Sequence, residues 1–379
     1  MAQKLKIAFA GDVNFSGIFR QQLLEGKEIF APELLQQLRE QDFVVVNLEG
    51  PATNIPTRKI NGVALHSPPE AIPYLIARNI KVFNLANNHL FDHGVAGFEE
   101  TVALIEKHGG QWFGAGKNLE QALKPIELAA NAISRGMIGI AHHEGMIASN
   151  SQVGVLCETS QKEISRAIMD FQKAGKQLIV NYHGGEEYTR YPAPERRKRL
   201  RSLALNAQSW VVAHHSHTLQ GVESVKGNQV FYSLGNFVFD LKLQANRGYI
   251  SQSAILFAEF DQAGGSYNWL PININTSTGI IETRQQEAFA NEIEALNNWA
   301  EYEKHWLAEA HRVFWMTRSG GEVANSDSSE GVRKGSPGIL KKLFKPSAWK
   351  AIWQIYRNPH TRPIAVGAVT YALKQKMGK

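Results

Sequence analysis

Short polar motifs in this chain carry the side chains that bind divalent metal ions. A hard cation takes oxygen and imidazole donors, and two neighbouring cations need a carboxylate that both can share. Six of the thirteen histidines lie in these motifs. The motifs therefore predict a two-metal centre. They are Gly11-Asp12-Val13-Asn14, Asn47-Leu48-Glu49-Gly50, and residues 87–94, 183–188 and 214–217.

Each motif also has a purely structural explanation. A Gly-Asp pair after a strand commonly forms a turn, and residues 87–89 can form a loop held by side-chain to backbone hydrogen bonds. His183 can be a hydrogen-bonded core residue, whereas the cluster at 214–217 is harder to explain structurally. All five motifs occur in one chain, each after a predicted strand, and this combination favours metal binding.

The elements that position these motifs alternate along the first 240 residues. Short β-branched runs indicate buried strands, and amphipathic stretches between them indicate helices. This alternation predicts an α/β fold of layered sheets flanked by helices. Each motif begins where a strand ends, which is the edge where ligands bind in open α/β folds. The strands are expected at 5–10, 43–48, 81–86, 177–182 and 210–213, the helices at 18–39, 95–108 and 194–207, and further strands within 219–282.

The single cysteine, Cys157, excludes an intramolecular disulfide and a cysteine-based zinc site. Charge is unevenly distributed along the chain. Residues 331–379 hold eleven Lys or Arg and no acidic residue, so the remainder holds 30 basic against 35 acidic residues. The basic character therefore belongs to the tail.

Six motifs in this order resemble those of the CapA proteins of bacterial poly-γ-glutamate capsule synthesis, which are related to calcineurin-like metallophosphoesterases. The family shows Gly-Asp, Asn-Leu-Glu, Ala-Asn-Asn-His-x-x-Asp-x-Gly, His-x-Gly-x-Glu-Tyr, His-x-His and Tyr-Ser-Leu-Gly-Asn-Phe motifs. In this chain they stand at 11–12, 47–49, 86–94, 183–188, 215–217 and 232–237. The resemblance covers about residues 5 to 240.

The resemblance implies a role for each matching residue. Asp12 and His217 would bind one metal, Glu49 would bridge both, and Asn88, His183 and His215 would complete the second site. Two divalent ions are implied, and the mixed His and carboxylate ligands suit Mn, Fe or Zn equally.

The resemblance also implies a catalytic pair. His89 would protonate the leaving group or stabilise the transition state, and Asp92 would orient its imidazole. A water activated by the metals would attack the substrate.

The chain departs from the wider metallophosphoesterase pattern at several positions. Asn14 stands where many of these proteins have a histidine, which weakens the first metal site. Gly184 replaces an aromatic residue and Ser216 a proline. No core ligand is lost.

Several polar residues are expected around the site. The predicted substrate-binding residues are Asn14, Asn47, Glu187, Tyr188 and Asn236. Residues 232–237 are interpreted as a buried strand that ends in a glycine turn, with Asn236 lining the site. His142 and His143 follow the strand at 137–141 and are candidates for contact with the ligands. The basic residues Arg190, Arg196, Arg197, Lys198 and Arg199 are interpreted as a solvated helix face unless one points into the cleft towards a phosphate or polycarboxylate.

Two classes of function are compatible with these motifs. The first is a metal-dependent hydrolase of a phosphoester or a related anhydride, acting on an anionic small molecule or polymer. The second is a non-catalytic assembly or binding protein of anionic polymer biosynthesis, with a structural or vestigial metal site. The complete ligand set and the pair of His89 and Asp92 favour the enzyme.

The expected domain organisation has four parts: a CapA-like domain at 1–285, a helical segment at 286–318, a flexible linker at 319–338 and a basic tail at 339–379. The tail either lies on an anionic membrane surface or packs as a helix on the catalytic domain. Nucleic-acid binding is disfavoured because no known module is present. With no signal-peptide pattern at the N-terminus, we expect a cytoplasmic location, with contact at the inner membrane face if the tail binds lipid.

Overall fold

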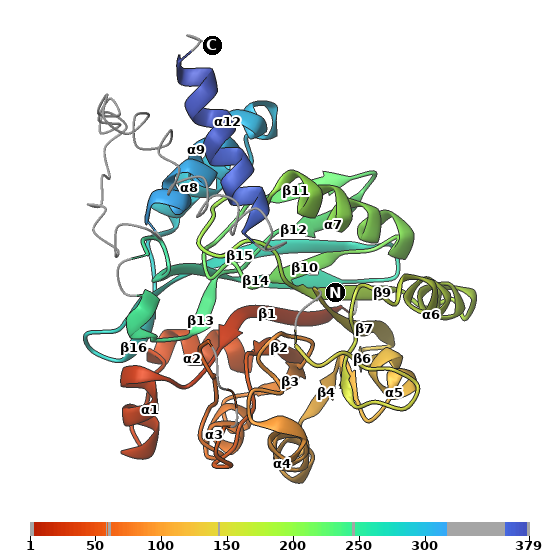
Figure 1. Cartoon of the computed structure of the whole chain (residues 1–379). Helices are drawn as coiled ribbons and strands as arrows, with labels where there is room; N and C mark the ends of the chain where they lie inside the picture. The colour runs from red at the N-terminus through yellow and green to blue at the C-terminus, as the bar shows by residue number, and fades with distance from the viewer. Residues whose placement is uncertain are drawn as a thin grey trace.

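Two β-sheets pack face to face, and helices cover their outer faces (Figure 1). The computed structural model describes residues 4–57, 59, 62–142, 145–244, 247–316 and 361–376. The predicted α/β fold of layered sheets flanked by helices is confirmed.

The first sheet is centred on β1 (Leu5–Val13). Strands β1, β2, β3 and β4 run parallel, and β14 joins β1 antiparallel from the other side. The order is β16-β15-β14-β1-β2-β3-β4, with β13 also pairing with β1. The remaining strands are β2 (Phe43–Leu48), β3 (Ile80–Asn84), β4 (Gln111–Phe113), β13 (Asn236–Val238), β14 (Gln252–Phe260), β15 (Gly265–Asn275) and β16 (Ile280–Thr283).

The second sheet has the order β11-β12-β10-β9-β7-β6. Strand β9 runs parallel to both of its neighbours, β7 and β10. A separate pair joins β5 (Ala115–Gly116) and β8 (Gly154–Val155). The strands of the second sheet are β6 (Ile126–Ala130), β7 (Ile133–Ala141), β9 (Leu178–His183), β10 (Val211–His214), β11 (Val222–Val225) and β12 (Asn228–Phe231).

Apolar side chains fill the space between the sheets. Phe9 and Val45 of the first sheet belong to the same buried cluster as Ile179, Val212 and Phe231 of the second. Helices α1 to α4 cover the other face of the first sheet, and α5 to α7 cover that of the second. These helices are α1 (Gly17–Leu24), α2 (Pro32–Arg39), α3 (Ala71–Ile76), α4 (Gly94–Lys107), α5 (Leu119–Leu123), α6 (Gln161–Lys173) and α7 (Pro194–Ala207).

The sequence placed most elements within a few residues but joined two helices into one. The predicted helix at 18–39 is wrong, because α1 ends at Leu24 and α2 begins with Pro32 at its first turn. Proline lacks the backbone N–H that a helix interior needs, so it starts a helix rather than continuing one.

The segment 232–237 also differs from the expected strand. Strand β12 ends at Phe231 and β13 begins at Asn236, so the residues between them leave the second sheet and cross to the first. The left-handed conformation of Gly235, with φ of 75°, allows this crossing. The expected burial of the segment is observed.

Three helices form a separate layer: α8 (Gln286–Leu296), α9 (Tyr302–Met316) and α12 (Arg362–Lys376). A short 3₁₀ helix, η2 (Trp299–Glu301), precedes α9, and a second, η1 (Lys242–Gln244), follows β13. Figure 1 shows α12 alongside α9, at the end of the molecule opposite α3 and α4. No helix within the described ranges is both long and apolar enough to cross a membrane. The predicted linker at 319–338 lies outside the described residues, and the division into four parts stays a prediction.

The close approach of β1 to the crossing segment yields a test. A Cβ atom added to Gly11 would lie 1.9 Å from the carbonyl oxygen of Gly235. We expect Gly11→Ala to lower the free energy of unfolding by about 3 kcal/mol, because backbone on both sides would have to move. Urea denaturation measures this. Gly264→Ala is the control, because a Cβ there meets nothing within 4 Å; an equal loss in both variants would contradict the interpretation.

Candidate metal centre

The six predicted metal ligands lie where strands of both sheets end. From the first sheet, Asp12 is the second-last residue of β1, Glu49 directly follows β2, and Asn88 follows β3. From the second sheet, His183 ends β9, and His215 and His217 follow β10. Parallel strands bring these ends together, as the sequence motifs predicted.

The ligands form two groups that share one residue. Asp12, Glu49 and His217 each offer a donor atom within 4.8 Å of the others, and so do Glu49, His183 and His215. All five side chains are buried. Glu49 belongs to both groups, which is the arrangement that a bridging carboxylate requires.

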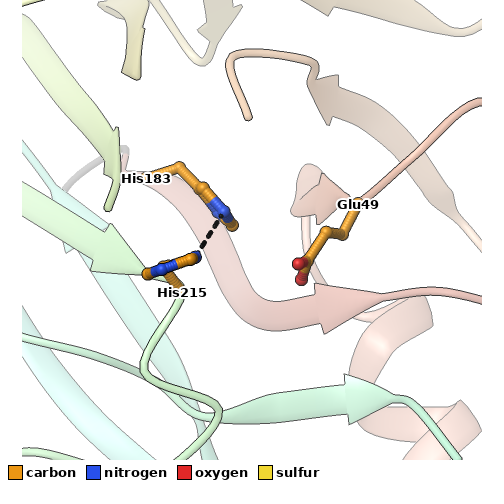
Figure 2. Close-up of side chains that lie close together, drawn as sticks. All are labelled: Glu49, His183 and His215. Carbon is orange, nitrogen blue, oxygen red and sulfur yellow. Dashed lines mark hydrogen bonds between the residues drawn. The ribbon is translucent and has the colours of Figure 1, made fainter. Parts of the chain in front are cut away.

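Short contacts define the second group. His183 Nε2 lies 3.1 Å from His215 Nδ1 and 2.9 Å from Asn88 Oδ1. Figure 2 shows the two imidazoles in contact and the Glu49 carboxylate turned towards them. Two ring nitrogens, an amide oxygen and a carboxylate are donors that Mn, Fe and Zn all accept, so the donor set fits a divalent ion.

The first group is held by longer contacts. His217 Nδ1 lies 3.6 Å from Asp12 Oδ2, and His217 Nε2 lies 3.8 Å from Glu49 Oε1. The structure thus brings all six predicted ligands together, while their assignment to individual ions stays a prediction.

Burial lowers the pKa of two histidines at these strand ends. Desolvation, together with the neighbouring imidazoles, lowers the pKa of His183 well below its ordinary value. Desolvation also lowers the pKa of the adjacent His214. A neutral imidazole keeps the lone pair that a metal ion needs.

The predicted catalytic pair stands beside the ligands. His89 Nδ1 lies 2.6 Å from Asp92 Oδ2, which turns the other ring nitrogen, Nε2, to within 3.9 Å of Glu49 Oε1. Burial alone would raise the pKa of Asp92, but the hydrogen bond with His89 and the ion pair with Lys59 hold it below its ordinary value. The ionised carboxylate fixes the orientation of the imidazole.

Three of the predicted substrate-binding residues contact ligands instead of lining an open surface. Asn14, Asn47 and Asn236 are at most 1% exposed. The side-chain amide of Asn47 donates to Asp12 Oδ1 at 2.8 Å and lies 3.0 Å from His183 Nδ1. Asn236 Oδ1 lies 2.9 Å from His217 Nδ1, and the Asn14 amide donates to the Glu49 carbonyl. These contacts orient the ligands; a role in substrate binding stays a prediction.

The other two predicted substrate-binding residues are less buried than these asparagines. Glu187 and Tyr188 are partly exposed. The Tyr188 ring stacks on His217 at 5.9 Å between centroids, and the Arg247 guanidinium lies 5.4 Å from the Tyr188 ring centroid. An aromatic side chain therefore borders the first ligand group, and a cation lies against that side chain.

The loop that follows β10 at residues 215–217, called here the histidine loop, has a strained backbone. His215 and His217 have φ of 91° and 57°, a region that residues other than glycine rarely adopt. The His215 N–H donates to Asp12 Oδ2 at 3.2 Å. Such strain persists only where the surrounding contacts fix the loop in place.

Arg196 provides some of these contacts, and the prediction of a solvated face is wrong for it. Its side chain is buried and donates to the carbonyl oxygens of His214 and Tyr232 at 3.2 and 2.7 Å. The helical spacing of Arg196 with Leu200 and Ala204, which are also buried, could have revealed this position.

Three other basic residues of this run pair with carboxylates. Arg197 bonds to Glu223, Arg190 to Glu292 and Arg199 to Glu158. Lys198 and Arg199 line a pocket of about 430 Å³ that α6 and α7 border, and none of the six ligands lines it. His142, predicted as a possible neighbour of the ligands, donates its backbone N–H to the His183 carbonyl, and its ring lies 3.5 Å from Glu158. His143 lies outside the described residues.

The lowered pKa of His183 predicts a pH dependence of stability. With metal removed by a chelator, the folded state stays unprotonated at His183 where the unfolded state takes up a proton. We expect each pH unit below about 6.5 to lower the free energy of unfolding by up to about 1.4 kcal/mol for this histidine. His183→Asn should show a shallower loss in thermal melts between about pH 7.5 and 5.5. Parallel curves for the two proteins would contradict it.

Comparison with known proteins identifies the family. The model of the family described as "Bacterial capsule synthesis protein PGA_cap" matches residues 6–241, which contain every predicted ligand. The "PGA biosynthesis protein CapA" of Bacillus subtilis is 30% identical over 284 residues, covering 72% of this chain and 73% of that protein. The "Capsule biosynthesis protein CapA" of Bacillus anthracis is 28% identical, covering 63% of this chain and 60% of that protein.

A mycobacterial protein extends the comparison. A "Probable polyglutamine synthesis accessory protein" of Mycobacterium tuberculosis is 26% identical, covering 69% of this chain and 72% of that protein. The family match includes both sets of strand ends that carry the candidate metal centre. The chain belongs to the PGA_cap family of bacterial capsule synthesis proteins.

Proposed function

We propose that this protein is a metal-dependent hydrolase of the phosphoesterase type. The observation that carries the proposal is the pair of buried ligand groups that share Glu49, with His89 directly beside them. A protein that only needs a structural metal has no use for a second ligand group or for an imidazole held at its edge. The resemblance to metallophosphoesterases points the same way.

The residues divide the chemistry between them. Asp12, Glu49 and His217 would hold one divalent ion, and Glu49, Asn88, His183 and His215 the other. Bound ions would supply Lewis-acid activation of a substrate oxygen and lower the pKa of a water molecule.

His89 would handle the leaving group. The bond to Asp92 fixes Nδ1, so Nε2 is the ring atom on the side of Glu49. A protonated Nε2 at this place would hydrogen-bond to the departing oxygen and give it a proton. Asp92 would act through His89, by holding the ring and stabilising its charged form.

The charge of Arg247 supports an anionic substrate. The Arg247 guanidinium, 5.4 Å from the centroid of the Tyr188 ring that stacks on His217, would attract a phosphate or carboxylate group through its positive charge. The names of the relatives refer to PGA biosynthesis and to capsule biosynthesis. We therefore propose an anionic small molecule or polymer of capsule metabolism as the substrate class.

A second candidate function is an assembly or binding role in anionic polymer synthesis. The names of the relatives favour it, because they refer to biosynthesis and to accessory proteins and not to hydrolysis. Turnover that depends on His89 would distinguish the hydrolase from an assembly protein, because an assembly protein has no need for this residue.

The test combines metal analysis with turnover of p-nitrophenyl mono- and diesters in the presence of Mn²⁺. We expect up to two ions per chain, fewer in Asp12→Ala, and unchanged metal content in His89→Ala. Because His89 is assigned to proton transfer, its removal should lower kcat by about 10²- to 10⁴-fold.

Exposed residues of the same types serve as controls. His108→Ala and Asp170→Ala should keep both metal content and turnover. Turnover by His89→Ala at the wild-type rate would remove the proposed mechanism. Absence of metal and of turnover with several ions would transfer support to the assembly role.

Substrate recognition by Arg247 gives a separate prediction. Arg247→Ala should raise KM for a phosphodiester about tenfold with little change in kcat, because a ground-state contact would be lost. Arg247→Lys should recover part of the affinity through its charge. Arg39→Ala, which changes an exposed arginine of α2, is the control. An unchanged KM in Arg247→Ala would show that this guanidinium does not contact the substrate.

A further inference from the structure

Helix α12 is attached to the body of the protein through one of its two faces. Ala365 and Ala368 are buried in a cluster with Phe314 of α9. The Tyr371 ring lies 4.8 Å from the His311 ring, and a Cβ atom at Gly367 would lie 2.6 Å from that of Ala310. The backbones of α12 and α9 therefore pack closely, and the face of α12 that carries these residues is covered by α9.

The opposite face of α12 is apolar and open to solvent. Val366, Val369 and Leu373 are 46%, 36% and 52% exposed. Their spacing of three and four residues places them in one stripe along the helix. They are three of the seven large hydrophobic side chains that are exposed among the described residues. Such side chains scattered singly need no explanation, whereas these three lie side by side and form one small apolar patch on the surface of the helix.

Positive charge borders this stripe. Arg362 is exposed and stands one helical turn before Val366. Lys374 follows Leu373 directly and makes a 2.8 Å ion pair with Glu303, although its side chain remains 44% exposed. Residues 331–379 as a whole contain eleven basic and no acidic residues. The basic residues at the two ends of the stripe therefore favour a partner that carries negative charge beside an apolar phase.

We infer that the exposed face of α12 is a docking surface for an anionic lipid membrane. A narrow apolar stripe with basic flanks is the pattern of helices that lie in the plane of the lipid headgroups. Because the other face of α12 is packed on α9, docking would hold the folded body at the lipid surface. The tail can therefore pack on the body of the protein through one face of α12 and contact a membrane through the other.

Vesicle sedimentation of the full chain tests the inference. We expect binding to phosphatidylcholine vesicles that contain about 30% phosphatidylserine, and much weaker binding to pure phosphatidylcholine. Binding should fall as NaCl is raised from about 0.1 to 0.5 M, because salt screens the attraction. The double variant Val366→Asp/Leu373→Asp should bind at least about tenfold more weakly, because charge opposes both apolar insertion and the anionic surface.

Controls separate the stripe from general surface effects. Leu24→Asp and Met169→Asp change side chains that are 57% and 50% exposed on other helices, and both should bind as the wild type does. Circular dichroism and thermal melting check the fold; if the aspartate variant unfolds, Val366→Ser/Leu373→Ser replaces it. Equal binding to neutral vesicles, no binding to anionic ones, or wild-type binding by the folded stripe variant would each overturn the inference. None of these outcomes depends on hydrolase activity.

Discussion

Two carboxylates and three imidazoles share one buried region. The residues around them compensate the free energy that the burial of these polar groups costs. Asp12 and Glu49 are both fully buried, and His183, His215 and His217 are nearly so. A carboxylate removed from water is destabilised by several kcal/mol unless cations or hydrogen-bond donors compensate. The amide of Asn47 and the backbone of His215 compensate part of this charge for Asp12. Divalent cations would compensate the rest.

The same constraint explains the unusual backbone nearby. Ligands from two sheets can converge only if the sheets end close together, and this requires the contact between Gly11 and Gly235 and the positive φ of His215. Arg196 donates to the carbonyl oxygens of His214, directly before the histidine loop, and of Tyr232, at the start of the crossing segment. Packing of the sheet interior thus fixes the distances at the edge.

Features that depend on neighbouring residues in the sequence could be predicted, whereas features that depend on contacts between distant segments could not. Strands such as β2 and the ligands at their ends could be predicted, because a β-branched run followed by a polar motif is a local pattern. The buried position of Arg196 and the crossing at 232–237 could not, because both depend on contacts between segments far apart in sequence. The prediction of a single helix at 18–39 was wrong for a local reason. The amphipathic pattern continues across Pro32, but a proline at this place starts a new helix. The hydrogen bonds of Asn14, Asn47 and Asn236 to the candidate ligands were not predicted, because a sequence motif does not show which residues lie next to each other in the fold.

The division of the ligands between the sheets has a consequence for biosynthesis of the protein. Asn88 and its partner His183 are separated by 95 positions, and His217 comes later still. A ribosome-bound chain that has released only the first sheet's ligands would hold Asp12, Glu49 and Asn88 without any of the histidines that face them. A metal ion held by all six residues would therefore be captured only after β10 and the loop that follows it have left the ribosome, while β13 and β14, the strands that complete the first sheet around β1, are still to come.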